Sequence, residues 1–316
     1  MNIQKVIPVA LTLALGIACH SQAAVSTQGL AVYNFQKTEA ATLDTSAVYQ
    51  KQFLGTGDRL VAAEDGVVRY VSARDVNTTL EHNLATGDIS FKRNFSRYLG
   101  NFVPKLPSGD EAQKYAEAFL ANNRLLPANR DELKVAHVGG LRTSAVLSTG
   151  QAGPVIDKLV TLTYSRQLNG LPVIGAGSKI IVNIGDSGEV VGVSRRWREL
   201  DKPVALRDTE LLNESEAYDL VKRQILSEFG AKSSFEVLQT QVAYFDNNGT
   251  SIQPVFAFQT KIQLADQKLP AVEYVGVIPA MRKPVEALNL TQNDPSALRV
   301  LKAGDLGAPG ETRAGE

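Results

Sequence analysis

The segment 168–193, LNGLPVIGAGSKIIVNIGDSGEVVGV, most limits what this chain can fold into, because its glycines fall between β-branched runs. A nucleotide-binding loop needs a strand, then glycines, then a helix whose N-terminal N–H groups face the phosphate. Here the GAG run is followed by the strand-forming residues Lys179–Ile184. The segment therefore predicts antiparallel strands joined by turns at Asn169-Gly170 and at 185–188, and not a phosphate-binding loop.

Apolar alternation between turn residues predicts further strands along the chain. They span residues 66–72, 88–95, 133–138, 159–166, 178–184, 189–197, 236–245, 253–264 and 271–278. Residues 25–56 are mixed and polar with little periodicity, and they predict no particular element.

Two helices are predicted by their capping residues and apolar stripes. Ser108 is a plausible N-cap with Glu111 at the capping-box position, before a stripe that ends near Asn122. In the second helix, Asn213 or Ser215 provides the cap, and Gly230 stands at the expected C-terminal position. Each helix is followed by strands, which fits a repeated α+β unit, although two generic amphipathic helices would give the same pattern.

The first 23 residues have the pattern of a secretory signal peptide. Lys5 precedes the apolar run Val6–Ala18, which is too short to span a bilayer, and small residues follow. Cys19 allows an alternative, an outer-membrane lipoprotein, but Gly16 stands where the lipid-attachment motif has leucine. We therefore expect a periplasmic or secreted protein whose mature form has no cysteine and no transmembrane segment.

The composition argues against several classes of function. The chain has 33 basic and 33 acidic residues, so nucleic acid is not an expected partner. Its histidines are His20, His82 and His137, none of them beside acidic residues at metal-ligand spacing. We expect no metal site and no cofactor, and we identify no catalytic residues.

The segment 163–197, TYSRQLNGLPVIGAGSKIIVNIGDSGEVVGVSRRW, resembles PepSY-type domains and the related propeptides of thermolysin-like and fungalysin-like metalloproteases. These share a tyrosine strand, an Asn-Gly turn, a Pro-Val-x-Gly core, an Asp/Gly turn and a valine-rich strand. The runs 215–226 and 242–260 resemble the helix and hairpin of a PepSY repeat. The resemblance covers residues 158–278, and it is more specific for fold than for function.

This resemblance implies an α+β fold with antiparallel sheets each packed against a helix, in two PepSY/cystatin-like units. We expect an N-terminal region at 24–150, which holds a divergent unit or none, a PepSY-like unit at 151–292, and a disordered tail at 293–316. The chain contains no His-Glu-x-x-His motif, so it resembles a free-standing relative of the protease precursors. Such relatives are associated with inhibiting, chaperoning or regulating exported proteins, proteases among them.

The run Arg195-Arg196-Trp197-Arg198 has two interpretations. It is either an exposed partner-binding strand or a strand end with Trp197 in the core and solvated arginines on the other face. Tyr164 and Arg166 are expected to share one face of a neighbouring strand. The predicted partner-binding residues are therefore Tyr164, Arg166, Arg196 and Arg198.

Three functions remain open from the sequence. The first is a binding module that contacts an exported protein. The second is a cofactor-free enzyme or a protein that binds a small apolar ligand in a cleft of the curved sheet. The third is a structural protein of the cell envelope without a discrete site.

Overall fold

The computed structural model describes residues 6–8, 29–36, 43–54, 59–64, 66–145, 150–266 and 268–288. The chain forms two compact units. Unit 1 takes residues 1–18 and 35–201, and unit 2 takes residues 19–34 and 202–316. The predicted tail and, apart from Val6–Pro8, the predicted signal peptide with Cys19 lie outside the described residues.

Unit 1 is built on one antiparallel sheet with the strand order β7-β8-β10-β11-β6-β5-β4-β3. In addition, β9 pairs with the end of β8, and β1 pairs with the end of β7. The strands are β1 (Val6–Pro8), β3 (Arg59–Glu64), β4 (Val67–Val71), β5 (Thr79–Asn83), β6 (Ile89–Lys92), β7 (Leu133–Ala145), β8 (Ile156–Leu168), β9 (Leu171–Gly175), β10 (Lys179–Ile184) and β11 (Val190–Arg196).

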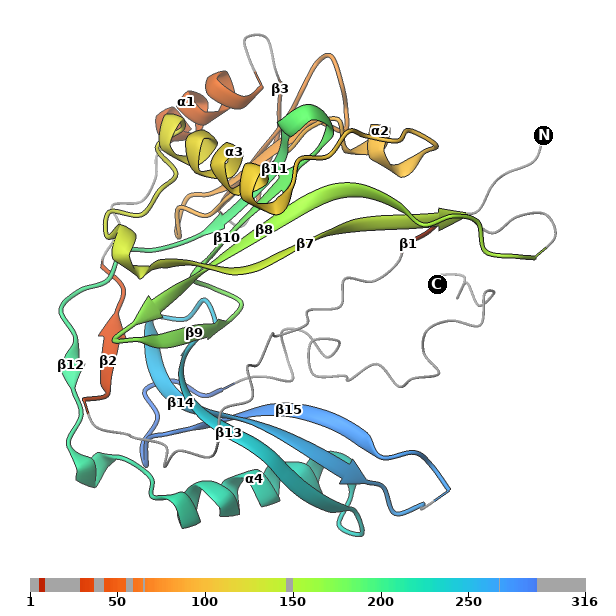
Figure 1. Ribbon diagram of the computed structural model, residues 1–316. Helices are drawn as coiled ribbons and strands as arrows, with labels where there is room; N and C mark the ends of the chain where they lie inside the picture. The colour runs from red at the N-terminus through yellow and green to blue at the C-terminus, as the bar shows by residue number, and fades with distance from the viewer. Residues whose placement is uncertain are drawn as a thin grey trace. The chain divides into compact units, whose positions relative to one another are not determined.

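Helices α1 (Leu43–Phe53) and α3 (Gly109–Asn122) pack on the same face of this sheet (Figure 1). The short helix α2 (Phe95–Leu99) lies near the end of β10, and two 3-10 turns occur at Arg130–Glu132 and Asp186–Gly188. We call the face under α1 and α3 the helix face, and the opposite face of β7, β8, β10 and β11 the open face.

The helix face carries the core of unit 1. The predicted capping box of α3 is confirmed, since Ser108 accepts a hydrogen bond from the Glu111 N–H and the Glu111 side chain bonds back to Ser108. The helix buries a stripe of small and apolar side chains, and an aromatic stack joins it to α1 and the sheet. The buried members include Ala112, Ala116, Leu120, Phe53, Phe91, Leu162, Tyr164, Ile180, Val193 and Trp197.

Unit 2 packs one helix on a smaller antiparallel sheet. β14 (Ser251–Gln263) pairs with β13 (Ser234–Asp246) and β15 (Val272–Pro279), and its first residues pair with β2 (Ala31–Asn34). β2 also pairs with β12 (Val204–Ala205), which precedes a 3-10 turn at Asp208–Glu210. Helix α4 (Glu214–Phe229) has Asn213 as its N-cap and Gly230 after its end, as predicted.

The predicted fold class, with antiparallel sheets each packed against one helix in two PepSY/cystatin-like units, is wrong. Strands hold 44% of the described residues against 22% in helices, and the long sheet of unit 1 does not repeat the sheet of unit 2. The sequence pattern missed α1 and β2 because both lie in the region 25–56, whose apolar residues show little periodicity.

The units also divide at a different point from the predicted regions. Residues 150 and 151 lie in the connection between β7 and β8, which pair over most of their length, so that 151–201 belongs with unit 1. Conversely, β2 belongs with unit 2 although it precedes most of unit 1 in the chain. No helix among the described residues is long and apolar enough to cross a membrane.

Candidate functional site

The four predicted site residues do not form one surface. Tyr164 and Arg166 share a face of β8, as predicted, but it is the helix face, and their exposed fractions are 2% and 0%. Arg196 is exposed on the open face, whereas Arg198 is half-buried with its guanidinium 3.5 Å from the ring centre of Phe35. A binding role for these residues remains a prediction. Of the four, only Arg196 is exposed.

Arg166 is a structural residue at the end of the sheet. Its Nε lies 2.9 Å from the Glu132 carboxylate, and its two terminal nitrogens donate to Ser178 Oγ at 3.2 Å and the Arg198 carbonyl at 2.7 Å. The guanidinium also stacks on Trp197, 4.2 Å from the ring centre. Because Trp197 is 2% exposed, the core interpretation of this tryptophan is confirmed. Arg166 thus fixes β8 to the segment that follows β11.

Tyr164 is unsuited to acid–base chemistry at neutral pH. Burial raises the pKa of its hydroxyl to about 12, and the negative charge of Glu117 acts in the same direction. The hydroxyl therefore stays protonated, and its position in the core of unit 1 keeps substrates away from it.

The open face carries a row of basic side chains that the sequence pattern did not reveal. Lys134 of β7 pairs with Ser165 of β8, Ser165 pairs with Lys179 of β10, and Lys179 pairs with Arg196 of β11. Directly paired residues of antiparallel strands point to the same face. We call these four residues the basic row. Lys134 and Arg196 are exposed, and Lys179 and Ser165 are half-buried.

Lys179 and Arg196 are like charges at directly paired positions, which destabilises a sheet by roughly 0.2–1 kcal/mol. Within the described part of the chain, no carboxylate forms an ion pair with Lys134 or Arg196. The exposed side chains of Lys134 and Arg196 therefore favour an anionic group near them.

One acidic residue lies near the Arg196 end of the row. Burial raises the pKa of the Asp88 carboxyl above its usual value, while a hydrogen bond with Thr86 and the charge of Arg196 act in the opposite direction. Asp88 therefore offsets part of the positive charge at Arg196. The next row on the open face is mostly uncharged. It contains His137, Thr163, Ile181 and Ser194, all half-buried.

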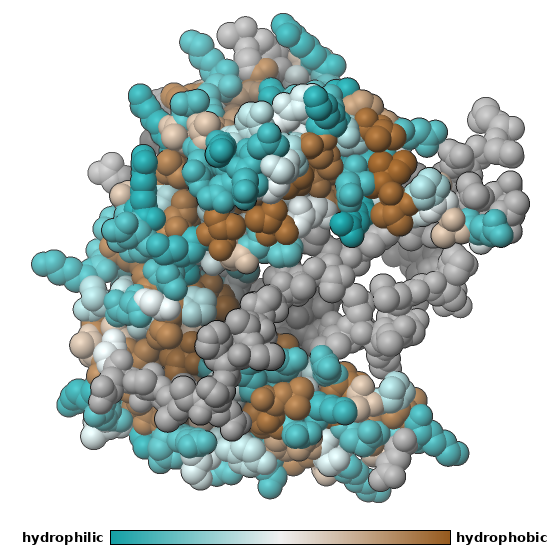
Figure 2. All heavy atoms as spheres, in the orientation of Figure 1, coloured by the Kyte–Doolittle hydropathy of each residue, from teal (hydrophilic) through white to brown (hydrophobic). Residues whose placement is uncertain are grey.

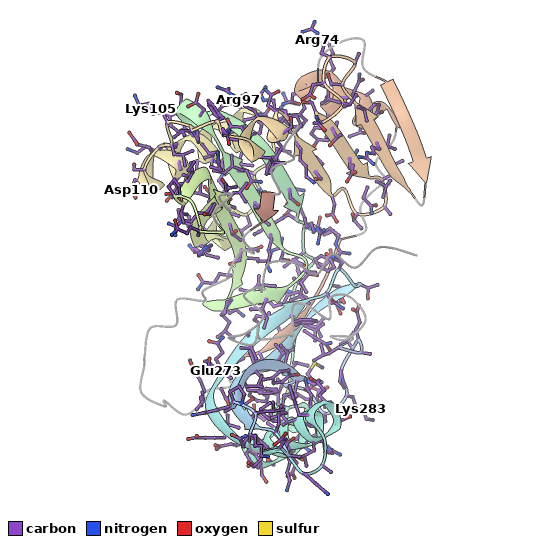
Figure 3. All side chains as sticks on the ribbon, turned by 90° about the vertical axis from the view of Figure 1, so that its right-hand side faces the viewer. Arg74, Arg97, Lys105, Asp110, Glu273 and Lys283 are labelled. Atoms are coloured by element: carbon purple, nitrogen blue, oxygen red, sulfur yellow. The ribbon has the colours of Figure 1, made fainter. Side chains whose placement is uncertain are left out.

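On the α2–α3 side of unit 1, one arginine forms an ion pair. Arg97 lies 3.6 Å from Asp186, which also accepts a hydrogen bond from the Lys105 N–H at 2.7 Å. Arg97, Lys105 and Asp110 project outward from this side (Figure 3). In the space-filling view, hydrophilic residues alternate with small apolar areas over the helices (Figure 2). The like-charged basic row is thus a distinct feature of the open face.

Two other polar groupings are structural. His82 and Ser46 are hydrogen-bonded at 2.7 Å, but both are buried, so the pair cannot reach a substrate. Tyr274 is buried under α4, where its hydroxyl donates to Glu228 at 3.0 Å and accepts from Gln224 at 2.8 Å. Among the described residues, no group of three His, Cys, Asp or Glu side chains is arranged to hold a metal ion.

Unit 2 has a shallow depression of about 260 Å³ at the end of β13 and β14. This volume lies below the roughly 300–1,000 Å³ of ordinary ligand pockets. Its polar lining includes Glu236 and Lys261, which pair across the strands. The depression gives little support for a site that binds an apolar ligand.

Sequence reasoning missed Lys134 and Lys179. The β10–β11 hairpin was predicted, but a register shift between Asn183 and Ile184 changes which residues pair, so the turn alone does not place Lys179 opposite Arg196. Lys134 could not be placed either, because β7 and β8 are joined by a long connection that sets no register.

Comparisons with known proteins give no assignment. No family model matches this chain, and no curated protein matches it. An uncharacterized protein from Eubacterium rectale shares 8% identity with a TM-score of 0.44, over 81% of this chain and 85% of that chain. The Bacillus megaterium YpeB C-terminal domain shares 14% identity with a TM-score of 0.35, over 78% of this chain and 95% of that chain. Both TM-scores are below 0.5, so neither similarity supports a functional assignment.

Proposed function

We propose that this protein is a PepSY-like binding module, periplasmic or secreted, that inhibits, chaperones or regulates another exported protein. The open face of unit 1 is the proposed contact surface. The observation that carries the proposal is the basic row, in which Lys179 and Arg196 stand directly opposite each other on an accessible sheet face. A binding partner with negative charge could pair with the exposed side chains of Lys134 and Arg196, which form no ion pair with a carboxylate among the described residues.

The structure beneath the row suits a preformed binding surface. The Arg166 network joins β8, the 3-10 turn at Arg130–Glu132 and the segment after β11, and Trp197 fills the core below. Strands held in this way lose little conformational freedom when a partner binds. The row extends over four neighbouring strands, which suits a macromolecular surface better than a small ligand.

A direct affinity measurement tests the proposal. The full chain would be used to capture proteins from the envelope fraction and medium of the exporting cell, and each captured candidate would then be purified. We expect Arg196→Ala to weaken binding of the purified partner by about tenfold or more, as loss of a central interface arginine does. Arg223→Ala, an exposed arginine on α4, is the matched control and should leave the Kd unchanged.

Two results would overturn the proposal. One is a purified partner whose Kd is the same for the wild type and for a folded Arg196→Ala variant. The other is turnover of a small molecule by the purified protein alone, which the enzyme alternative predicts.

A further inference from the structure

We infer that the outer edge of β7 binds an extended segment of the exported partner, which adds to the sheet of unit 1 as an antiparallel strand. The segment that fits has β-branched residues along the edge and acidic residues near Lys134. This inference rests on the proposed function and specifies how the partner is held. It follows from the unpaired backbone of β7, from a short strand that lies on its end, and from its side chains.

β7 is a long edge strand with an open backbone. It has 13 residues and lies outermost beside β8 (Figure 1). Between Lys134 and Leu141, its outer side pairs with no other strand of the described chain. An unpaired edge presents N–H and C=O groups that can bind a further strand. Edges that avoid such binding are commonly short or contain proline, and β7 is long and has no proline.

Two irregularities define the part of β7 that can pair without interruption. The register with β8 shifts just before His137 and just after Leu141. The five residues between these shifts keep a regular register, and about five or six residues is the usual length of a strand. Gly139 and Gly140 lie at the centre of this stretch and have no side chain to cover the backbone. A partner strand can therefore approach closely here.

A short strand of the chain itself lies on the end of this edge. β1, with the sequence Val-Ile-Pro, pairs antiparallel with Thr143–Ala145 of β7. The edge therefore accepts an apolar extended segment in the antiparallel orientation. Because β1 covers only these three residues, it leaves His137–Leu141 open. Removal of the predicted signal peptide would open the rest of the edge.

Valine side chains at the edge favour a β-branched partner strand. Val135 and Val138 pair with Tyr164 and Leu162, which are buried on the helix face. The valines nevertheless have exposed fractions of 39% and 44%, because no strand lies outside them in the described part of the chain. An added strand would cover both with its own side chains.

The charges along β7 favour an acidic partner and oppose a second copy of the chain. The strand contains Lys134 and Arg142 and no acidic residue. Arg142 lies 2.6 Å from Asp157, whereas Lys134 forms no ion pair with a carboxylate among the described residues. An antiparallel pair of two β7 strands would bring the Lys134 end of one copy to the Arg142 end of the other, where like charges repel. An acidic residue of a different protein would instead pair with Lys134.

Calorimetric titration of the full chain with three synthetic peptides tests the inference. The first, acetyl-Thr-Val-Thr-Val-Thr-Glu-Glu-amide, places β-branched residues opposite His137–Leu141 and acids near Lys134. The second has the same sequence with the amide nitrogens of its threonines and valines methylated, and the third has glutamine in place of both glutamates. We expect the first to bind. The second should bind at least about tenfold more weakly because it cannot donate hydrogen bonds to the edge, and the third about threefold more weakly because exposed ion pairs contribute little.

Two pairs of matched variants locate the bound peptide. Lys134→Gln should weaken binding of the first peptide about threefold, whereas Lys92→Gln, at an exposed lysine of the interior strand β6, should leave it unchanged. Val138→Asp should weaken binding about tenfold, because it places a charge against the added strand. Val275 of β15 is also 44% exposed, so Val275→Asp is the control and should have no effect.

Several outcomes would overturn the inference. They are no binding of the first peptide, equal binding of the methylated peptide, and effects of the control variants as large as those of Lys134→Gln and Val138→Asp. Sedimentation of the free chain as a dimer that the first peptide dissociates would assign the edge to a second copy instead. Each leaves the proposed function to its own test, because the Kd of a purified partner for Arg196→Ala does not depend on the peptides. Peptide binding together with an unchanged partner Kd would instead overturn the proposed function alone.

Discussion

The two faces of the unit 1 sheet place an arginine side chain in opposite environments. On the helix face, Arg166 is fully buried and meets a carboxylate, a hydroxyl, a carbonyl and an indole ring. On the open face, Arg196 is exposed and stands opposite Lys179. A buried cation is tolerated when it is paired with an opposite charge and hydrogen-bonded, whereas an exposed cation can stay beside another at modest cost. The first arrangement holds the fold together, and the second belongs to the surface that we propose for binding.

The largest expected effect comes from breaking the buried network. Arg166→Met should destabilise unit 1 by about 3 kcal/mol or more, because Glu132, Ser178 and the Arg198 carbonyl lose their partner in a buried site. Arg196→Met should change stability by less than about 1 kcal/mol. Trp197 is the only tryptophan of the chain and lies in unit 1, so its fluorescence during urea unfolding reports on this unit. Equal effects of the two substitutions would contradict the assignment of the faces.

An intermediate effect should appear as pH dependence from His82, which is buried on the helix face. Burial lowers the pKa of His82 below its unfolded value of about 6.5. Above that pH the ring is neutral in both states; below it the unfolded chain takes up a proton that the folded chain does not. Stability of unit 1 should therefore fall as the pH drops below about 6.5, by at most about 1.4 kcal/mol per pH unit.

Urea unfolding of unit 1 between pH 7 and pH 5.5 measures this dependence through Trp197 fluorescence. His82→Gln should flatten the slope, since glutamine can still bond Ser46 but does not titrate. A slope that survives His82→Gln would show that another group causes it.

The smallest effect is a gain in stability. Lys179→Gln or Arg196→Gln should stabilise unit 1 by a few tenths of a kcal/mol, because each removes one member of a like-charged pair. The double variant should add almost nothing beyond either single variant, which a double-mutant cycle resolves. Destabilisation by both single variants would show that these side chains already support the fold.

Local signals predicted the parts of the fold that depend on neighbouring residues. The caps at Ser108 and Asn213 located both long helices, since each bonds a residue three positions along. The Asn169-Gly170 turn was predicted because both positions need a positive φ, and the observed angles are 49° and 78°. In contrast, β2 has only four residues, and its partners are distant in the chain.

The candidate site depended on register between strands. The sequence predicted that Arg196 and Trp197 lie on opposite faces of the sheet, because successive side chains of a strand point to alternate faces. It placed Tyr164 and Arg166 on one face but could not say whether that face is buried, because α3 covers it from a separate part of the chain. A buried arginine was also unexpected from residue type, since arginine is mostly exposed unless it is paired.

The position of β2 in the chain sets an order for synthesis. β2 completes unit 2 by pairing with β12 and with Ser251 and Ile252, yet all of residues 35–201 are made before either partner exists. At a translation rate of 5–20 residues per second, roughly ten to thirty seconds pass between the synthesis of β2 and the synthesis of its partner strands. During that time Leu30, Val32 and Tyr33, which are almost fully buried in the finished protein, have no partners from unit 2. A nascent chain halted before residue 202 therefore carries an apolar segment that holding chaperones and proteases recognise.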